Sequence, residues 1–257
     1  MSDAHAAPAP DAAAANPEPA EEEDDDFAHD GVRMTRDVIV KSLSRADRQR
    51  EDFDAHLRRL THLRLDGKNI GRVDALATVP GVRVLYLYDN VISRLAGLDP
   101  LAPSLTHLYL QNNNLPRVEG LAKLAKLQKL YLDGNRITYV DGLGGCAELE
   151  ELHLSAQRLD PEEELEFDAQ TMASLARSLR VLVASRTRVR DPRPLRALAS
   201  LRVLDLSHCQ IEATRDLESV LLSAKKLTSL DARGNPGLSK GPKHRRDAKL
   251  TLLGQSL

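Results

Sequence analysis

Leucine and other aliphatic residues recur along most of this 257-residue chain at intervals of about 22 residues. The recurring pattern is L-x-x-L-x-L-x-x-N-x-I. The first position of each copy, counted here as the start of a unit, falls at Leu60, Val82, Leu105, Leu127, Leu149, Leu179, Leu201 and Leu227. Positions four and six are apolar and alternate with variable residues, which predicts a short strand with one buried face in each unit. The clearest copies are residues 105–126 and 127–148.

A repeat of this length is typical of a solenoid, in which a single unit has no core and stacked units share one. Each strand pairs in parallel with the next at about 4.8 Å. We therefore predict an α/β solenoid, a leucine-rich-repeat horseshoe of about eight units, over residues 60–239. We also predict a disordered acidic, Ala/Pro-rich arm at 1–31, an N-terminal helical cap at 32–59 and a C-terminal cap at 240–257.

Helix signals flank and interrupt the repeats. Thr35 is a candidate N-cap for a helix with apolar residues at helical spacing. The fifth unit is eight residues longer than its neighbours, and Asp160, followed by Pro161 and Glu162, predicts a helix start there. Asp168 predicts the cap of a second helical turn. Residues 217–222 predict a helix on the outer side of the seventh unit.

The ninth position of a unit is where the chain leaves the strand, and a buried amide there can bond to otherwise unpaired backbone groups. We predict a structural ladder of asparagines at this position: Asn90, Asn113, Asn135 and Asn235. The other units carry Lys68, Gln157, Thr187 and Cys209. Cys209 is therefore interpreted as a buried ladder substitute rather than a reactive thiol.

Strand residues between the buried leucines face the concave side of a horseshoe, and four of the five tyrosines fall there. Three of them occupy position five of consecutive units. Tyrosine combines a large rigid surface with a polar tip, which suits a binding hot spot; the alternative is that tyrosine simply favours strands. The predicted protein-binding residues are Tyr86, Tyr88, Tyr109, Gln111, Tyr131, Asp133, Glu151, His153 and Asp205.

Composition and charge refine this picture. Hydrophobic residues make up 42% of the chain but aromatic residues only 3%, with no Trp, so the core must be aliphatic. Residues 1–30 hold ten acids and no Lys or Arg, whereas the remainder carries 36 basic and 28 acidic residues. A basic body suits acidic partners; the alternative is an ordinary well-solvated surface. The acidic N-terminus does not resemble a secretory signal, and no apolar run has membrane-spanning length, so we expect an intracellular, soluble protein.

Residue patterns for catalysis or cofactor binding are missing from the sequence: it has no Gly-rich phosphate loop, H-E-x-x-H or C-x-x-C. His62 and His107 lie two units apart, near 10 Å, which is too far for shared zinc ligation. The basic cluster at 240–246 lacks the interleaved aromatics of a nucleic-acid platform. We therefore expect no enzyme activity, cofactor, metal, nucleic-acid or membrane binding, and a monomer before partner binding.

Several stretches also resemble a known family. They are VRMTRDVIVKSLSR, LTHLRLDGKNI, VLYLYDNVISRL, LTHLYLQNNNL, KLYLDGNRITYVDGL, LEELHLSAQRL and LEFDAQTMASLARSL. From Val32 to Leu257 the chain is similar to the leucine-rich-repeat regulators of protein phosphatase 1, most closely the regulatory subunit 42 family. The acidic arm lies outside the family pattern, and repeats six and seven depart from it at Ala184, Thr187 and Pro192.

The resemblance implies docking of the protein phosphatase 1 catalytic subunit, association with tubulin and microtubule motors, and a location in the cytoplasm and cytoskeleton, at the centrosome, basal body or cilium. In the wider class, concave residues grip the phosphatase. No basic-x-Val-x-Phe docking motif occurs here, because Phe27, Phe53 and Phe167 all lack Val two residues earlier. The alternatives are a ciliary or axonemal adaptor without phosphatase and, more remotely, a nuclear ribonucleoprotein repeat protein.

Overall fold

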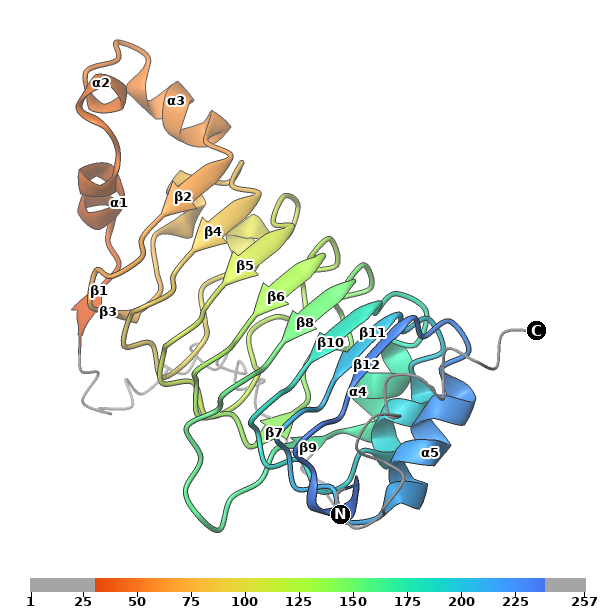
Figure 1. Ribbon diagram of the computed structural model, residues 1–257. Coiled ribbons are helices and arrows are strands. Elements are labelled where there is room, and N and C mark those ends of the chain that lie inside the picture. Colours follow the sequence, from red (N-terminus) through yellow and green to blue (C-terminus); the bar gives the residue numbers. More distant parts are fainter. Residues whose placement is uncertain (1–30, 239–257) are drawn as a thin grey trace, which may run out of the picture.

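A computed structural model describes residues 31–238 (Figure 1). The predicted arm up to Asp30 and the predicted C-terminal cap lie outside the described residues. One strand from each unit joins a parallel eight-stranded sheet whose order follows the chain without crossing. These strands are β2 (His62–Arg64), β4 (Val84–Tyr86), β5 (His107–Tyr109), β6 (Lys129–Tyr131), β8 (Glu151–His153), β10 (Val181–Val183), β11 (Val203–Asp205) and β12 (Ser229–Asp231).

The sheet has the register that the repeat predicts. Equivalent residues pair across every step, so that Leu85 faces Leu63 on one side and Leu108 on the other. The leucines at positions four and six point inward: Leu108 and Leu110 have no exposed surface. Each unit thus contributes one layer to a continuous aliphatic core, as the low aromatic content requires.

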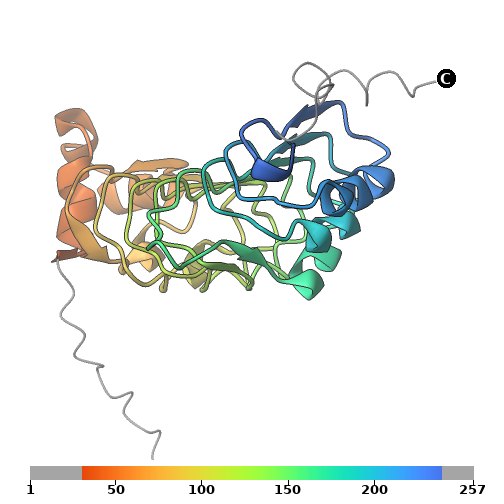
Figure 2. The same ribbon diagram turned by 60° about the horizontal axis from the view of Figure 1, so that its bottom comes forward.

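The opposite side of the stack is built from short helical turns (Figure 2). They are η1 (Leu76–Thr78), η2 (Asp99–Leu101), η3 (Arg193–Ala197), α4 (Ala169–Ser174) and α5 (Thr214–Ser223); η4 (Pro236–Leu238) instead follows the ninth-position turn of the last unit, where the Gly237 amide donates to the Ile211 carbonyl. Helical turns are wider than strands, so the stack curves and places the sheet on its concave face. In α5, Leu217 and Val220 pack into the core, whereas Leu222 is 77% exposed.

Three short helices cover the open core at the N-terminal end: α1 (Arg36–Ser42), α2 (Arg45–Arg48) and α3 (Phe53–Arg59). Thr35 caps α1 by accepting a hydrogen bond from the Val38 amide. Ile39 and Leu57 are buried against the first repeat. The sequence gives no signal for β1 (Val32–Arg33), which pairs with β3 (Ile70–Arg72) beyond the end of β2.

The predicted helix start at Asp160 is wrong. Residues 160–163 form a single turn, in which the Glu163 amide donates to the Asp160 carbonyl and the Glu163 carboxylate accepts from the Asp160 amide. The chain then extends into β9 (Glu166–Phe167), which pairs with β7 (Tyr139–Val140). This pairing buries Phe167 and keeps the backbone straight, which outweighs the local helix signal. Asp168 does cap α4, through the Thr171 amide.

The ninth-position asparagines tie each unit to the one before it. The amide of Asn113 donates to the carbonyls of Leu110 in its own unit and Leu87 in the preceding unit, at 3.1 and 2.9 Å. Its side-chain oxygen accepts from the Ile92 amide at 3.0 Å. The side chain has no exposed surface. Asn90, Asn135 and Asn235 make the equivalent set, and so does Gln157 with its longer side chain.

The ladder weakens in units six and seven. The Thr187 hydroxyl donates to the Ala184 carbonyl in its own unit and lies 3.6 Å from the Cys209 sulfur, but it makes no hydrogen bond to unit five. The Cys209 thiol reaches back to the same carbonyl, with a sulfur–oxygen distance of 3.2 Å. Its exposed fraction is 4%, and burial raises the pKa of the thiol, so the group stays protonated and acts as a weak donor.

Replacing Asn113 or Asn135 with Ala should lower the free energy of unfolding by about 1–3 kcal/mol, because buried backbone groups lose their partners. Cys209→Ala should cost less. Thermal denaturation of the three single variants measures the difference. Equal losses for Asn135→Ala and Cys209→Ala would contradict this account of the ladder.

The eighth position of each unit adopts a left-handed backbone conformation, so the chain can turn off the strand into the buried ninth residue. Gly, Asn and Asp tolerate this region, and Gly134 and Asn112 occupy it with φ of 68° and 54°. Ala156 and Arg186 occupy it as well, with φ of 54° and 58°. An alanine or arginine Cβ is strained in this conformation.

Ala156→Gly should therefore raise the free energy of unfolding by about 1 kcal/mol, since the strain of a left-handed alanine is removed. Ala125→Gly is the matched control: Ala125 is also exposed but has no positive φ, so the same exchange should be neutral or destabilising. Chemical denaturation of both variants measures the two changes. A lower stability for Ala156→Gly would rule out strain at the eighth position.

Candidate protein-binding surface

A row of stacked rings crosses the concave face. The position-five residues of β4, β5, β6 and β8 are paired in register, and their rings lie parallel. Ring centroids are 4.8 Å apart for Tyr86 and Tyr109, 4.7 Å for Tyr109 and Tyr131, and 4.4 Å for Tyr131 and His153. The distances match the spacing of parallel strands, so the backbone sets the stack. We call these four residues the aromatic row.

Arg64 closes the row at its N-terminal end. The Arg64 guanidinium lies over the Tyr86 ring at 5.3 Å from its centroid and donates to the Tyr88 hydroxyl at 3.2 Å. Tyr88 meets Tyr86 edge-on, with centroids 6.5 Å apart. The cation is held against the negative face of the ring, where it is attracted electrostatically. Arg64 also pairs with Asp66 at 3.4 Å.

The tyrosines are less exposed than a free binding hot spot would be. Their positions on the concave face predict exposed side chains for Tyr86, Tyr109 and Tyr131, but each is half-buried, because its ring faces are covered by its neighbours in the row. What remains accessible is the ring edges and the hydroxyl tips. Within the described residues, the Tyr86 and Tyr109 hydroxyls have no hydrogen-bond partner, so both are available to a ligand.

A charged cluster lies beside the middle of the row. Glu151 pairs with Lys129 on the neighbouring strand at 2.8 Å and accepts from the Tyr131 hydroxyl at 3.2 Å. Burial raises the pKa of Glu151, but the Lys129 ammonium more than offsets it, so the carboxylate has a lowered pKa. Burial and the Glu151 charge raise the pKa of Tyr131 to about 12. The Tyr131 hydroxyl therefore stays protonated and donates, and the Glu151 carboxylate stays ionised and accepts.

Asp133 and His153 form the other side of this cluster. Asp133 accepts from the Ser155 amide at 2.7 Å, and burial raises its pKa. Burial lowers the pKa of His153, although the charges of Asp133 and Glu151 act in the opposite direction. The imidazole is thus neutral at pH 7 and stacks as an aromatic ring.

The structure brings most of the predicted site residues together but separates one. Tyr86, Tyr109, Tyr131, His153, Glu151, Asp133, Tyr88 and Gln111 lie on four adjacent strands or directly after them. The Gln111 side-chain oxygen is buried and unbonded within the described residues. Asp205 lies two strands beyond His153, across Val183, and accepts from the Ser207 amide.

The predicted set omitted three residues that shape this face. Arg64 and Lys129 supply its cations, and Val183 continues the line of the row as a half-buried apolar side chain. All three could have been found from sequence, because they occupy positions three or five of their units. Strand position alone predicts all three on the concave face, whereas tyrosine and acid content does not indicate them.

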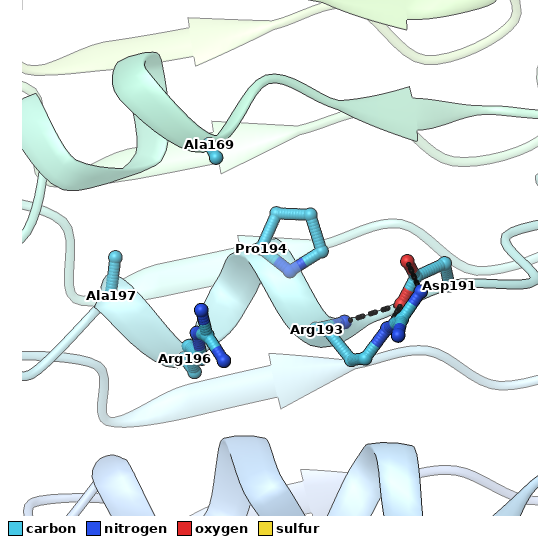
Figure 3. Close-up of a pocket in the computed structure, with 6 residues that line it drawn as sticks. All are labelled: Ala169, Asp191, Arg193, Pro194, Arg196 and Ala197. Atoms are coloured by element: carbon cyan, nitrogen blue, oxygen red, sulfur yellow. Dashed lines mark hydrogen bonds and ion pairs between the residues drawn. The ribbon is translucent and has the colours of Figure 1, made fainter.

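Outside the concave face, an open groove carries one acidic and two basic side chains. A groove of about 400 Å³ between α4 and η3 is lined by Ala169, Asp191, Arg193, Pro194, Arg196 and Ala197 (Figure 3). Asp191 holds Arg193 through two hydrogen bonds of 2.8 and 2.7 Å. Across residues 31–238, no cluster of three or more His, Cys, Asp or Glu could hold a metal ion. None of the helices in that range could cross a bilayer.

The pKa of His153 is lower in the folded chain than in the unfolded chain. As the pH falls, the imidazole is therefore protonated in the unfolded chain at a higher pH than in the folded chain. Stability should therefore decline as the pH falls below the ordinary histidine value of 6.5. NMR titration of the imidazole, assigned by its loss in His153→Phe, should give a midpoint below 6.5. His153→Phe should also reduce the pH dependence of the melting temperature. A midpoint above 6.5 would contradict the burial of this ring.

Comparisons with known proteins agree with the fold. Residues 103–143 match a family model for leucine-rich repeats in two copies, and residues 200–222 match a single leucine-rich-repeat model. Two Listeria monocytogenes internalins are similar in structure. The internalin InlF has a TM-score of 0.63 and 24% identity, with 77% of this chain and 56% of the internalin covered. Internalin C2 has a TM-score of 0.60 and 23% identity, covering 77% and 84%.

TLR13 in its complex with ssRNA13 is also similar, with a TM-score of 0.56 and 22% identity over 69% of this chain and 25% of that one. This chain therefore spans little more than half of the InlF structure and a quarter of TLR13. At these identities the likeness shows the fold alone. Taken together, the repeat matches, the one-strand-per-unit parallel sheet and the structural neighbours show that this chain contains leucine-rich repeats and has the leucine-rich-repeat solenoid fold.

Proposed function

We propose that the chain is a non-catalytic scaffold that holds another protein on its concave face. The observation that carries the proposal is the aromatic row with its flanking charges. Half-buried tyrosines that are preordered by stacking lose little rotamer freedom on binding, which lowers the entropic cost of forming an interface. Eight parallel strands span about 34 Å, which is enough for a protein interface of standard size.

The geometry also limits how a partner is contacted. Stacking uses the ring faces, so a partner side chain cannot lie flat on Tyr109. It meets ring edges, which carry partial positive charge, and hydroxyls, which donate and accept. Lys129 and Arg64 add positive charge near the row, and Glu151 adds an acceptor. We expect carbonyl or carboxylate groups of the partner to lie against the row.

The partner that the sequence resemblance favours is the protein phosphatase 1 catalytic subunit, with this chain as its regulatory subunit. The same resemblance supports association with tubulin and microtubule motors, and a location at the centrosome, basal body or cilium. The absence of a basic-x-Val-x-Phe motif around Phe27, Phe53 and Phe167 supports docking through the concave surface instead.

The triple variant Tyr86→Ala, Tyr109→Ala, Tyr131→Ala tests the proposal. Pull-down of purified phosphatase catalytic subunit by the full chain should weaken at least tenfold, since loss of a hot-spot residue costs about 2 kcal/mol or more. Tyr139→Ala is the control, because Tyr139 is exposed on β7, outside the concave sheet.

Circular dichroism and melting must first show that the triple variant remains folded, as loss of the stack also removes packing. Wild-type binding by the folded triple variant would exclude the concave row as the docking site. If the wild-type chain binds tubulin or axonemal proteins but not the phosphatase, the adaptor function replaces the regulatory one.

A further inference from the structure

Positive charge is concentrated in the last three units. Residues 177–238 carry twelve Lys and Arg against six Asp and Glu, whereas residues 31–176 carry nineteen against 21. The cap and first five units are therefore slightly acidic, and the last three carry a net charge of +6. This asymmetry is distinct from the concave row, which lies in units two to five.

Five of these cations gather where three adjacent strands begin. The members lie at or just before the starts of β10, β11 and β12, and all are exposed; they are Arg177, Arg180, Arg202, Lys225 and Lys226. Backbone hydrogen bonds hold the three turns side by side: the Arg202 amide donates to the Arg180 carbonyl at 2.7 Å, and the Thr228 amide to the Arg202 carbonyl at 2.8 Å. We call this cluster the basic rim (the strand starts are visible in Figure 1).

The rim is poorly neutralised by its surroundings. Arg180 pairs with Glu150 at 3.0 Å. Arg177, Arg202, Lys225 and Lys226 have no ion pair within residues 31–238. The corresponding turns of units two to four hold the cations Arg83 and Lys126 but otherwise carry uncharged residues such as Pro80, Gly81 and Ser104. The repeat framework therefore does not require cations at this edge.

The same chain supplies a segment of matching chemistry. Glu21, Glu22, Glu23, Asp24, Asp25 and Asp26 form an unbroken run of six acids. The run ends five residues before Gly31, the first described residue, which lies beside Asn69 and Gly71 of the first unit. A fully extended chain spans about 3.5 Å per residue, so the middle of the run reaches at most about 26 Å from Gly31.

That reach is too short for the run to cover the rim of its own copy. From β2 to β10 there are five strand steps, or about 24 Å, and to β12 there are seven, or about 34 Å. Gly31 also lies beyond the end of β2, whereas the rim lies where strands begin, so the path must cross the width of the molecule as well. Only another copy can place its acidic run on the rim.

We propose that the acidic run at residues 21–26 of one copy binds the basic rim of a second copy, and that two copies exchange their acidic runs to form a salt-sensitive pair. The exchange is reciprocal, so the two copies form a closed dimer in which each basic rim is occupied by the acidic run of the other copy. The contacts are exposed ion pairs, which salt screens strongly. The pair therefore forms at low ionic strength, where it replaces the monomer expected from the sequence, and it leaves the concave row open.

Sedimentation velocity of the full chain tests the proposal directly. At about 50 mM salt the wild type should self-associate, and at about 500 mM it should be monomeric, as the screening length falls several-fold. Two variants should each weaken low-salt association at least tenfold. One replaces the six acids with Gln and Asn, and the other carries Arg177→Glu, Arg202→Glu and Lys226→Glu.

The matched control is Arg58→Glu, Arg117→Glu, Arg136→Glu. It reverses the charge of three exposed cations outside the rim that also lack ion pairs within the described residues. It should associate as wild type does. A chain that combines the rim reversal with Lys at all six acidic positions should recover association, because the charges are exchanged rather than removed. A wild type that is monomeric at low salt, an unaffected arm variant, a control as weak as the rim variant, or failed recovery would each overturn the proposal.

Discussion

The spacing of hydrogen-bonded parallel strands is the constraint on which the rest of this molecule depends. One strand per unit, each paired in register with the next, sets a distance of about 4.8 Å between equivalent residues. Leucines placed at that spacing form a continuous core, and rings placed at that spacing stack. The same backbone geometry therefore produces both the stability of the solenoid and the order of its aromatic row.

The curvature that exposes this row comes from the opposite side of the units. Helical turns such as α5 and η3 occupy more width than the strands they follow, so the sheet lies on the inner face. Inner-face side chains are then held by a rigid sheet rather than by loops, which is why Tyr131, Glu151 and Lys129 are fixed relative to one another. A partner therefore binds a preformed surface, and little side-chain entropy is lost from this face on binding.

Much of the fold can be predicted from the sequence because each unit repeats the same pattern of apolar and polar positions. The positions of Leu108, Asn113 and Tyr109 within a unit predict the core, the ladder and the inner face. The prediction failed where tertiary pairing outweighed local signals. Asp160 has the neighbours of a helix start, yet the pairing of β9 with β7 keeps the chain extended. The half-burial of the tyrosines was also missed, because side-chain stacking depends on rotamers that strand position does not specify.

The weakened ladder at Thr187 and Cys209 has a consequence for how the molecule unfolds. In a linear array, cooperativity is carried only by contacts between neighbouring units. Each intact amide bonds to the preceding unit as well as its own, whereas the Thr187 side chain makes no hydrogen bond to unit five. The junction between units five and six thus transmits less coupling than those before it. Under partial denaturation, we expect amide hydrogens of the last three units to exchange together and ahead of the rest, so that the chain unfolds as two cooperative blocks joined at the elongated fifth repeat.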